Sequence, residues 1–154
     1  MRVYKVTKPA NENVINDITT LMMEQMESLS VNVGKEALAN TIATALKAHS
    51  GAEFFVAESD NLFVGAAFLN SGLGLDKGGA YIWLNDLYVK KDYRRQGIAR
   101  KLLLNVLYWA EQHKFNGIEL ETGINNAATK KLYNSLGFYD IVSKRYGRTL
   151  TRPE

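Results

Sequence analysis

The stretch NDLYVKKDYRRQGIARKLLLNVLYWAEQ, residues 85–112, decides the fold, because the pattern of its apolar residues changes halfway along. The run that leads into it, AYIWLNDLYV at residues 80–89, is apolar and aromatic and long enough for a central strand. Beyond Gly97, apolar residues recur at the spacing of one helical face. They are Ile98, Leu102, Val106 and Ala110, with Ala99, Leu103 and Leu107 beside them. The sequence therefore predicts a strand-to-helix junction at residues 94–97.

The residues before this junction predict two helices and three strands. The strands are expected at residues 2–6, 52–59 and 62–70, and the helices at residues 11–29 and 38–46. Asp60 and Asn61 separate two of the strands, and such a polar pair is typical of a tight turn. We interpret the methionine-rich stripe of the first helix as core packing, and the glycine-rich residues 71–79 as a loop.

The residues after the junction predict a short strand at 116–122 and a helix at 125–138, with Asn at its start and Gly137 just past its end. Residues 139–150, YDIVSKRYGRTL, supply two more strand-like pieces. The order of elements predicts an α/β fold with a mixed central sheet of about six to seven strands flanked by about four helices. With 154 residues and no internal repeat, we expect a single domain over 1–154.

The composition excludes several classes of protein. The chain has no cysteine, so it has no disulfide framework, thiolate zinc site or thiol nucleophile, and no metal site is predicted. A net charge of +3 is modest, which argues against nucleic acid as the partner of the basic clusters. The N-terminal residues lack the apolar core of a signal peptide, and no window reaches the length of a membrane span. We therefore expect a cytoplasmic protein with no membrane partner.

The junction itself has the chemistry of an anion site. The first backbone N–H groups of a helix have no internal partner, and the helix dipole adds partial positive charge there. Gly97 leaves room for close approach, Ala99 is small, and three arginines add charge that suits phosphate: Arg94, Arg95 and Arg100. The motifs for nucleoside triphosphates and for dinucleotides are both missing. The spacing Arg94-x-x-Gly97-x-Ala99 therefore predicts a site for a diphosphate.

At this point the sequence resembles a known family. LNDLYVKKDYRRQGIARKLL followed by NNAATKKLYNSLGF is similar to the GNAT superfamily of acetyl-CoA-dependent N-acetyltransferases, whose pyrophosphate loop follows Arg/Gln-x-x-Gly-x-Gly/Ala. The order of elements matches the family over nearly the whole chain, and the motifs cover residues 80–138. Arg95 stands where the family often has Gly, and Thr129 where it often has Ala. The resemblance implies a GNAT-like fold and acetyl-CoA as co-substrate.

The resemblance also implies a set of cofactor-binding residues. The backbone of residues 87–89 would run beside the pantetheine arm, and the amides of residues 95–100 would hold the pyrophosphate. Asn126 occupies a position where the family commonly has an asparagine that contacts the cofactor. The cofactor-binding residues expected on this basis are Leu87, Tyr88, Val89, Arg94, Arg95, Gln96, Gly97, Ile98, Ala99, Arg100 and Asn126.

Aminolysis of a thioester needs an unprotonated amine, a polarised carbonyl and a proton for the leaving thiolate. Tyr133 occupies the family's position for a tyrosine near the thioester sulfur, and its phenol is a proton donor at neutral pH. From the residues alone, Tyr133 would be a core residue. Asp86 is the expected base, because a carboxylate in an apolar central strand is often functional or ion-paired. The alternatives are Glu119 and Glu121, whereas His49 and His113 are interpreted as surface residues at helix ends.

The sequence thus predicts an N-acetyltransferase whose partners are acetyl-CoA and the primary amine of a small molecule or peptide. We expect direct attack of the amine, because no cysteine and no evident Ser–His pair would carry an acyl-enzyme. Two alternatives stay open: a regulatory module that binds acyl-CoA without turnover, and a nucleic-acid-binding domain that uses the basic clusters. A homodimer is compatible with all three.

Overall fold

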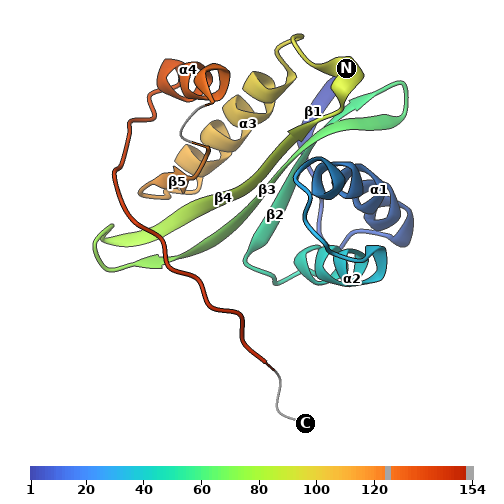
Figure 1. Cartoon of the computed structure of the whole chain (residues 1–154), viewed down its shortest axis with the longest axis horizontal. Coiled ribbons are helices and arrows are strands. Elements are labelled where there is room, and N and C mark those ends of the chain that lie inside the picture. Colours follow the sequence, from blue (N-terminus) through green and yellow to red (C-terminus); the bar gives the residue numbers. More distant parts are fainter. Residues whose placement is uncertain (124–125, 152–154) are drawn as a thin grey trace. The chain divides into compact units, whose positions relative to one another are not determined.

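The computed structural model describes residues 1–123 and 126–151 of the chain. These residues form two compact units, Met1–Glu121 and Thr122–Glu154, each of which is described by itself (Figure 1). The first unit contains the sheet and three helices, and the second contains one helix and the C-terminal segment. Whether the whole chain acts as one domain stays a prediction.

The first unit is built on one 5-stranded sheet in the order β1-β2-β3-β4-β5. Its strands are β1 Arg2–Lys5, β2 Ala52–Ser59, β3 Leu62–Gly74, β4 Gly79–Val89 and β5 Ile118–Leu120. The first three pairings are antiparallel and the β4–β5 pairing is parallel. The expected mixed sheet is confirmed, with five strands in the described residues where six to seven were predicted.

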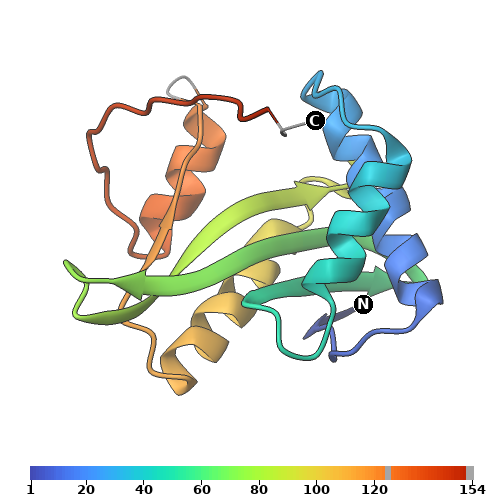
Figure 2. The same cartoon turned by 90° about the horizontal axis from the view of Figure 1, so that it is seen from below.

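Helices cover both faces of this sheet (Figure 1 and Figure 2). The helices of the first unit are α1 Glu12–Ser28, α2 Lys35–Ala45 and α3 Ile98–Gln112, and α4 Ala127–Ser135 belongs to the second unit, which agrees with the predicted number. Neighbouring residues of β2 identify the two faces. Phe54 packs in the cluster with α1 and α2, whereas the ring of Phe55 lies 5.7 Å from that of Trp109 in α3.

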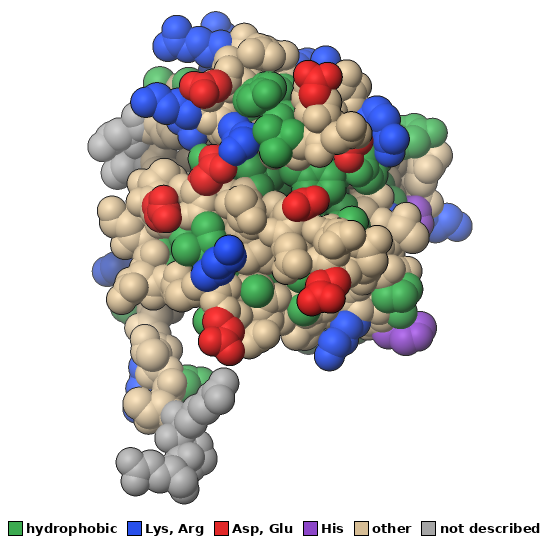
Figure 3. All heavy atoms as spheres, turned by 90° about the vertical axis from the view of Figure 1, so that its right-hand side faces the viewer, with side chains coloured by type: hydrophobic (Ala, Val, Ile, Leu, Met, Phe, Trp, Pro, Cys, Tyr) green, Lys and Arg blue, Asp and Glu red, His purple; other side chains and the backbone are tan. Residues whose placement is uncertain are grey.

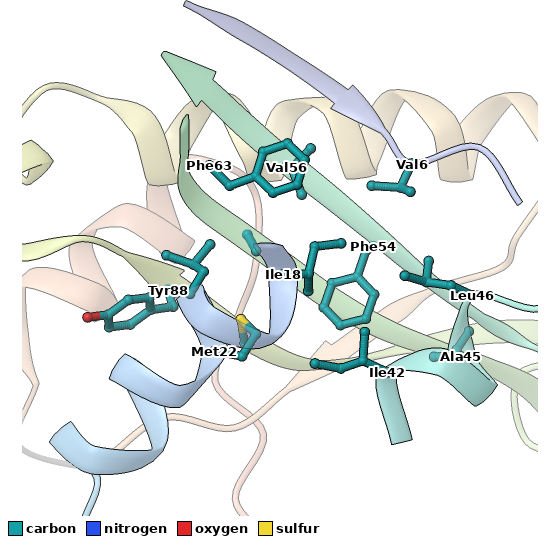
Figure 4. Packing of buried hydrophobic residues seen from close by; sticks show 13 residues of the cluster. Val6, Ile18, Met22, Ile42, Ala45, Leu46, Phe54, Val56, Phe63 and Tyr88 are labelled. Atoms are coloured by element: carbon teal, nitrogen blue, oxygen red, sulfur yellow. The ribbon is translucent and has the colours of Figure 1, made fainter. Parts of the chain in front are cut away.

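The core between the sheet and the α1–α2 pair explains the methionine-rich stripe (Figure 4). Ile18 and Met22 of α1 meet Ile42 of α2 and Phe54 of β2, and all four side chains are buried. Apolar burial of this kind stabilises a fold by roughly 25 cal/mol per Å². The interpretation of the stripe as core packing is therefore confirmed at Met22.

Two hairpins connect the antiparallel strands. Asp60 and Asn61 form the predicted tight turn, with φ values of 50° and 62° that suit the right-handed twist of β2 and β3. The prediction of a loop over residues 71–79 was wrong, because most of these residues belong to the second hairpin. Residues 71–74 pair with residues 79–82 of β4, because glycine disfavours strands only weakly when a partner strand supplies backbone hydrogen bonds.

In the second unit the helix cap is present, but the two strands predicted at residues 139–150 are not formed. Asn126 caps α4, with its side-chain oxygen accepting a hydrogen bond from the Thr129 amide at 3.2 Å. Residues 139–150, however, contain no strand, and all of them are exposed. Apolar side chains alternate only over Tyr139 and Ile141, and the adjacent Val142 then breaks the period of two that a half-buried strand needs.

Candidate functional site

A β-bulge in β4 sets the direction of Asp86. Phe68 of β3 lies opposite Asp86, and the next residue, Leu69, lies opposite Leu84, so Asn85 has no partner in the register. Such an extra residue shifts the alternation of side chains by one position. Residues before and after the bulge that would otherwise share a face of the sheet then lie on opposite faces. Leu84 therefore shares the α3 face with Leu69, whereas Asp86 and Phe68 point to the face that α1 and α2 cover.

Asp86 lies in the wall of a small apolar cavity on that face. The cavity has a volume of about 120 Å³ and is lined by Met22, Met26, Leu38, Thr41, Ile42, Phe54, Phe68 and Asp86. Within residues 1–123 and 126–151, the Asp86 carboxyl group has no hydrogen-bond or ion-pair partner in the protein. Burial raises the pKa of the Asp86 carboxyl group above its usual value of 3.8. A carboxyl group with a raised pKa is a better base near neutral pH, because it holds a proton more strongly.

The backbone of β4 beyond the bulge has an unpaired side. Pairing with β5 ends at Leu84 and Leu120, so residues 85–89 have no β5 partner in the described chain. The amide of Lys90 donates to the carbonyl of Val64 in β3 at 2.8 Å. Because backbone groups alternate along a strand, those of Leu87 and Val89 point away from β3. An extended chain with amide groups of its own fits beside this edge.

The N-terminus of α3 follows this edge after a short 3-10 turn, η1 Lys91–Tyr93. Gly97 is the N-cap residue, with a left-handed backbone at φ 76°, and it offers no side-chain hydrogen bond to the first turn. Helix α1 differs, because the Asn11 side chain accepts from the Val14 amide. A Cβ atom placed on Gly97 would meet nothing within 4 Å. The first turn of α3 is thus open to a guest, and its amides and dipole favour an anion.

The arginines before α3 have different surroundings. The Arg94 Nε donates to the carbonyl of Val89 at 3.0 Å, and its guanidinium lies 5.7 Å from the ring centre of Tyr88. Arg94 therefore ties the loop to the end of β4. Arg95 is exposed and adopts a left-handed backbone at φ 62°, a conformation that glycine adopts more easily.

The side chain of Tyr88 is held by α1. Its hydroxyl donates to Glu24 Oε1 at 3.3 Å, and Lys90 forms an ion pair with the same carboxylate. Burial raises the pKa of Tyr88, and the negative charge of Glu24 adds to the shift. The side chain of Tyr88 is thus held by α1, and its backbone groups point to β3 like those of Lys90, so its expected contact with the cofactor stays a prediction.

Gly65 of β3 is a further site residue, which the sequence reasoning missed. A Cβ atom at this position would lie 3.2 Å from the Ile98 side chain, 3.2 Å from the Tyr88 carbonyl oxygen and 3.3 Å from Leu102. Only glycine lets the first turn of α3 approach the sheet this closely. A glycine within an apolar strand was the available signal.

We expect Gly65→Ala to destabilise the protein by about 1–3 kcal/mol and to weaken acetyl-CoA binding, because α3 must move away from β4. Denaturant unfolding and calorimetric titration with acetyl-CoA measure the two effects. Gly72→Ala on the same strand is the control, since its nearest neighbour lies 4.0 Å away at the Tyr81 ring. Equal stability and affinity of the two variants would contradict this role of Gly65.

The alternative bases have other partners or an exposed position. Glu119 forms an ion pair with Lys77 at 3.2 Å. Glu121 is exposed, and so is His49. The His113 ring lies 2.9 Å from the Trp109 carbonyl oxygen and stacks near the Trp109 ring, at the end of α3 where a surface role was expected. Of the three carboxylates considered from the sequence, Asp86 alone lines the cavity on the α1–α2 face.

Tyr133 and Asn126 belong to the second unit. Tyr133 is buried at 8% exposure, and its ring contacts Phe138 edge to face with the ring centres 5.6 Å apart. Burial raises the pKa of Tyr133, so its hydroxyl keeps its proton at neutral pH. The side chain of Asn126 serves as the cap of α4. Their expected roles toward the cofactor stay predictions.

The described residues contain neither a cluster of metal ligands nor a membrane-spanning helix. Across residues 1–123 and 126–151, no group of His, Cys, Asp and Glu side chains could hold a metal ion. In the same part of the chain, the helices are too short or too polar to cross a bilayer.

The mixed sheet, the β4–β5 pairing that ends at Leu84 and the glycine-capped start of α3 define an α/β fold with an open strand edge that leads to a helix N-terminus. The chain belongs to the Acetyltransferase (GNAT) family, which it matches over residues 16–138. It is 34% identical to human N-acetyltransferase 8 over 91 residues, which are 57% of this chain and 39% of the human protein. It is also 34% identical over 80 residues to the [Ribosomal protein bS18]-alanine N-acetyltransferase of Escherichia coli, covering 52% of this chain and 51% of that protein.

These matches are partial. The chain spans about two fifths of the length of the N-acetyltransferase 8 proteins that it matches. Solved structures match over nearly the full chain at lower identity. A probable acetyltransferase superposes with a TM-score of 0.84 at 20% identity, covering 99% of this chain and 100% of that one. The aminoglycoside N-acetyltransferase AAC(6')-Iy in complex with CoA gives 0.77 at 17% identity, covering 96% and 93%. At such identities the structures establish the fold alone.

Proposed function

We propose that this protein transfers the acetyl group of acetyl-CoA to a primary amine by direct attack of the amine. The observation that carries the proposal is the arrangement of one strand and one helix. The unpaired edge of β4 leads within a few residues to the open first turn of α3, and Asp86 lies on the same strand, facing the apolar cavity. A thioester arm, a diphosphate and an amine thus each have a matching surface.

The described residues fit acetyl-CoA. Gly97 leaves open space in front of the first turn of α3, and the amides of residues 98–100 would hold the pyrophosphate. Arg95 and Gln96 are exposed beside them, and Arg100 adds charge from the helix. The backbone of Leu87 and the amide of Val89 would pair with the pantetheine arm, since the Val89 carbonyl already accepts from Arg94 Nε. When bound, acetyl-CoA supplies an activated acyl group on a good leaving thiolate.

Two residues of the chain would then transfer protons during the reaction. Asp86 would bind the ammonium form of the substrate and accept a proton from it, directly or through water. The amine nitrogen forms the new bond to the acetyl carbon while the bond to sulfur breaks, and the nitrogen then releases its second proton to solvent. Asp86 passes the proton that it accepted to solvent after each turnover. Tyr133 would donate its phenol proton to the leaving thiolate and recover it from solvent. Burial raises its pKa above 10.0, so the phenol is protonated at neutral pH, as an unburied tyrosine also is.

Two measurements test the proposal. Calorimetric titration should detect acetyl-CoA binding, and a thiol reagent should detect CoA release when a panel of amines, amino acids, aminoglycosides and peptides is added. Binding without release for every acceptor would favour the regulatory module. Affinity for nucleic acid that falls steeply with salt, without acetyl-CoA binding, would favour the third alternative.

Asp86→Asn is expected to lower turnover at neutral pH while acetyl-CoA affinity is kept. Part of the loss should return at higher pH, where more of the substrate amine is already deprotonated. Initial rates over a range of pH and calorimetric titration measure these effects. Asp17→Asn makes the same change at an exposed position of α1 and should leave the rates unchanged.

The same variant has an expected effect on stability. Burial raises the pKa of Asp86 in the folded chain, so the ionised carboxylate destabilises the fold once the pH exceeds the unfolded value, 3.8. Asn removes that cost, and the melting temperature should be equal to or above that of the unmodified protein at neutral pH. The difference should vanish as the pH falls toward 3.8. A much lower melting temperature with full activity per molecule would assign Asp86 a structural role.

A further inference from the structure

The cavity beside Asp86 also limits the size and polarity of the group that the substrate amine carries. Its residues come from α1, α2 and the three strands β2, β3 and β4, all within the first unit. Its volume of about 120 Å³ is slightly below the roughly 150 Å³ at which an apolar cavity in a protein core holds a benzene molecule. The space therefore suits a group of about four to six carbon atoms.

The walls of the cavity are apolar apart from one charge. Methionine, leucine, isoleucine and phenylalanine side chains form most of the lining, and Asp86 is its one ionisable member among the described residues. Thr41 is the other polar member, and its hydroxyl already donates to the Ala37 carbonyl at 3.0 Å. The cavity thus offers one carboxylate to bind one cation, and few hydrogen-bond partners for other polar groups of a ligand.

The charges of the surrounding surface lie outside this lining. Figure 3 views the side of the molecule that faces right in Figure 1, where α1 and α2 lie, and hydrophobic side chains are visible there between acidic and basic ones. Glu24 of α1 is already paired with Lys90 and Tyr88. A second ammonium group inside the cavity would lose its water without gaining a carboxylate, which is costly.

We propose that the acceptor is a primary monoamine with a compact apolar group of about four to six carbons, and that Asp86 binds its ammonium while the group fills the cavity. This inference rests on the proposed acetyl transfer and narrows its substrate class. Polyamines and aminoglycosides are disfavoured, because their further ammonium and hydroxyl groups would face methionine and phenylalanine side chains.

The four methionines of the chain provide a direct binding test that needs no turnover. Met22 and Met26 line the cavity, whereas Met1 and Met23 do not, so the latter two are internal controls. With methyl-labelled methionine, 3-methylbutylammonium should shift the NMR signals of Met22 and Met26. The affinity should fall at least tenfold in Asp86→Asn, and putrescine should leave these signals in place. Equal response of Met1 and Met23, an equal response to putrescine, or no response at all would overturn the inference.

A kinetic series tests the same point through catalysis. From propylamine to pentylamine, kcat/KM should rise about threefold to fourfold per methylene, as burial of a CH₂ group predicts, and should fall once the chain exceeds the cavity. Met26→Ala enlarges the cavity and should move the optimum to longer amines. Met23→Ala, a matched change one residue beyond Met22 on the same helix, should keep the optimum.

The two tests separate this inference from the proposed function. If Met22 and Met26 respond as expected but no amine releases CoA thiol, the cavity assignment stands and the acetyl transfer is wrong. If CoA thiol is released with polyamines or aminoglycosides and not with apolar monoamines, the transfer stands and the substrate class is wrong.

Discussion

Replacing Gly97 with glutamate is expected to abolish acetyl-CoA binding while the fold is kept. The first turn of α3 has no side-chain cap, and the space where the new side chain begins is open. A carboxylate there would occupy the place of the pyrophosphate and repel it. Two unit charges about 4 Å apart interact by roughly 4 kcal/mol near a protein surface, and this corresponds to about a thousandfold in affinity.

Gly97→Gln is the matched control for this prediction. Glutamine has the shape of glutamate, and it meets the same strain at φ 76°, so both variants should lose about 1 kcal/mol of stability. The affinity of the Gln variant should fall much less, because it lacks the charge. Circular dichroism, thermal unfolding and calorimetric titration separate these effects. A folded Glu variant that binds acetyl-CoA normally would place the diphosphate elsewhere.

The parts of the fold that depend on local pattern could be predicted from the sequence. The apolar stripe from Ile98 to Ala110 specifies α3, and the polar pair Asp60 and Asn61 specifies the turn of the first hairpin. Both signals act within a few residues of the structure they produce. The open space at the start of α3 could also be predicted, because Gly97 has no side chain to fill it.

Features that depend on partners far along the chain could not be predicted in this way. The bulge at Asn85 exists only in the register between β3 and β4, and a strand without it would point Asp86 to the opposite face. The close approach at Gly65 depends on Ile98 and Leu102. Met26 carries the same periodic signal as Met22, although only the packing of α2 makes it part of a cavity wall.

The C-terminal residues show the limit of composition as a signal. β-branched and aromatic residues between Tyr139 and Leu150 favoured two strands, yet a strand forms only where a neighbour accepts its backbone hydrogen bonds. The described segment has exposed apolar side chains and no such pairing. Residue type alone therefore overestimated the number of strands.

Tyr133→Phe is expected to lower turnover by roughly ten- to a thousandfold, as loss of a positioned proton donor should, with a smaller change in acetyl-CoA affinity. The change removes only the hydroxyl. The edge-to-face contact with Phe138 needs the ring, which phenylalanine keeps. Within residues 126–151 the Tyr133 hydroxyl has no hydrogen-bond partner, so the melting temperature should barely change.

Tyr139→Phe is the control, because Tyr139 lies in the same unit and its side chain is 80% exposed. This variant should retain full turnover. The two interpretations of Tyr133 differ most clearly in single-turnover rates at saturating acetyl-CoA, where binding no longer limits the reaction. A proton donor to the leaving thiolate affects that rate directly, whereas a residue that only packs the core affects it through stability. Equal rates for the Tyr133→Phe variant and the unmodified protein would return Tyr133 to the core, and the leaving thiolate would then take its proton from water.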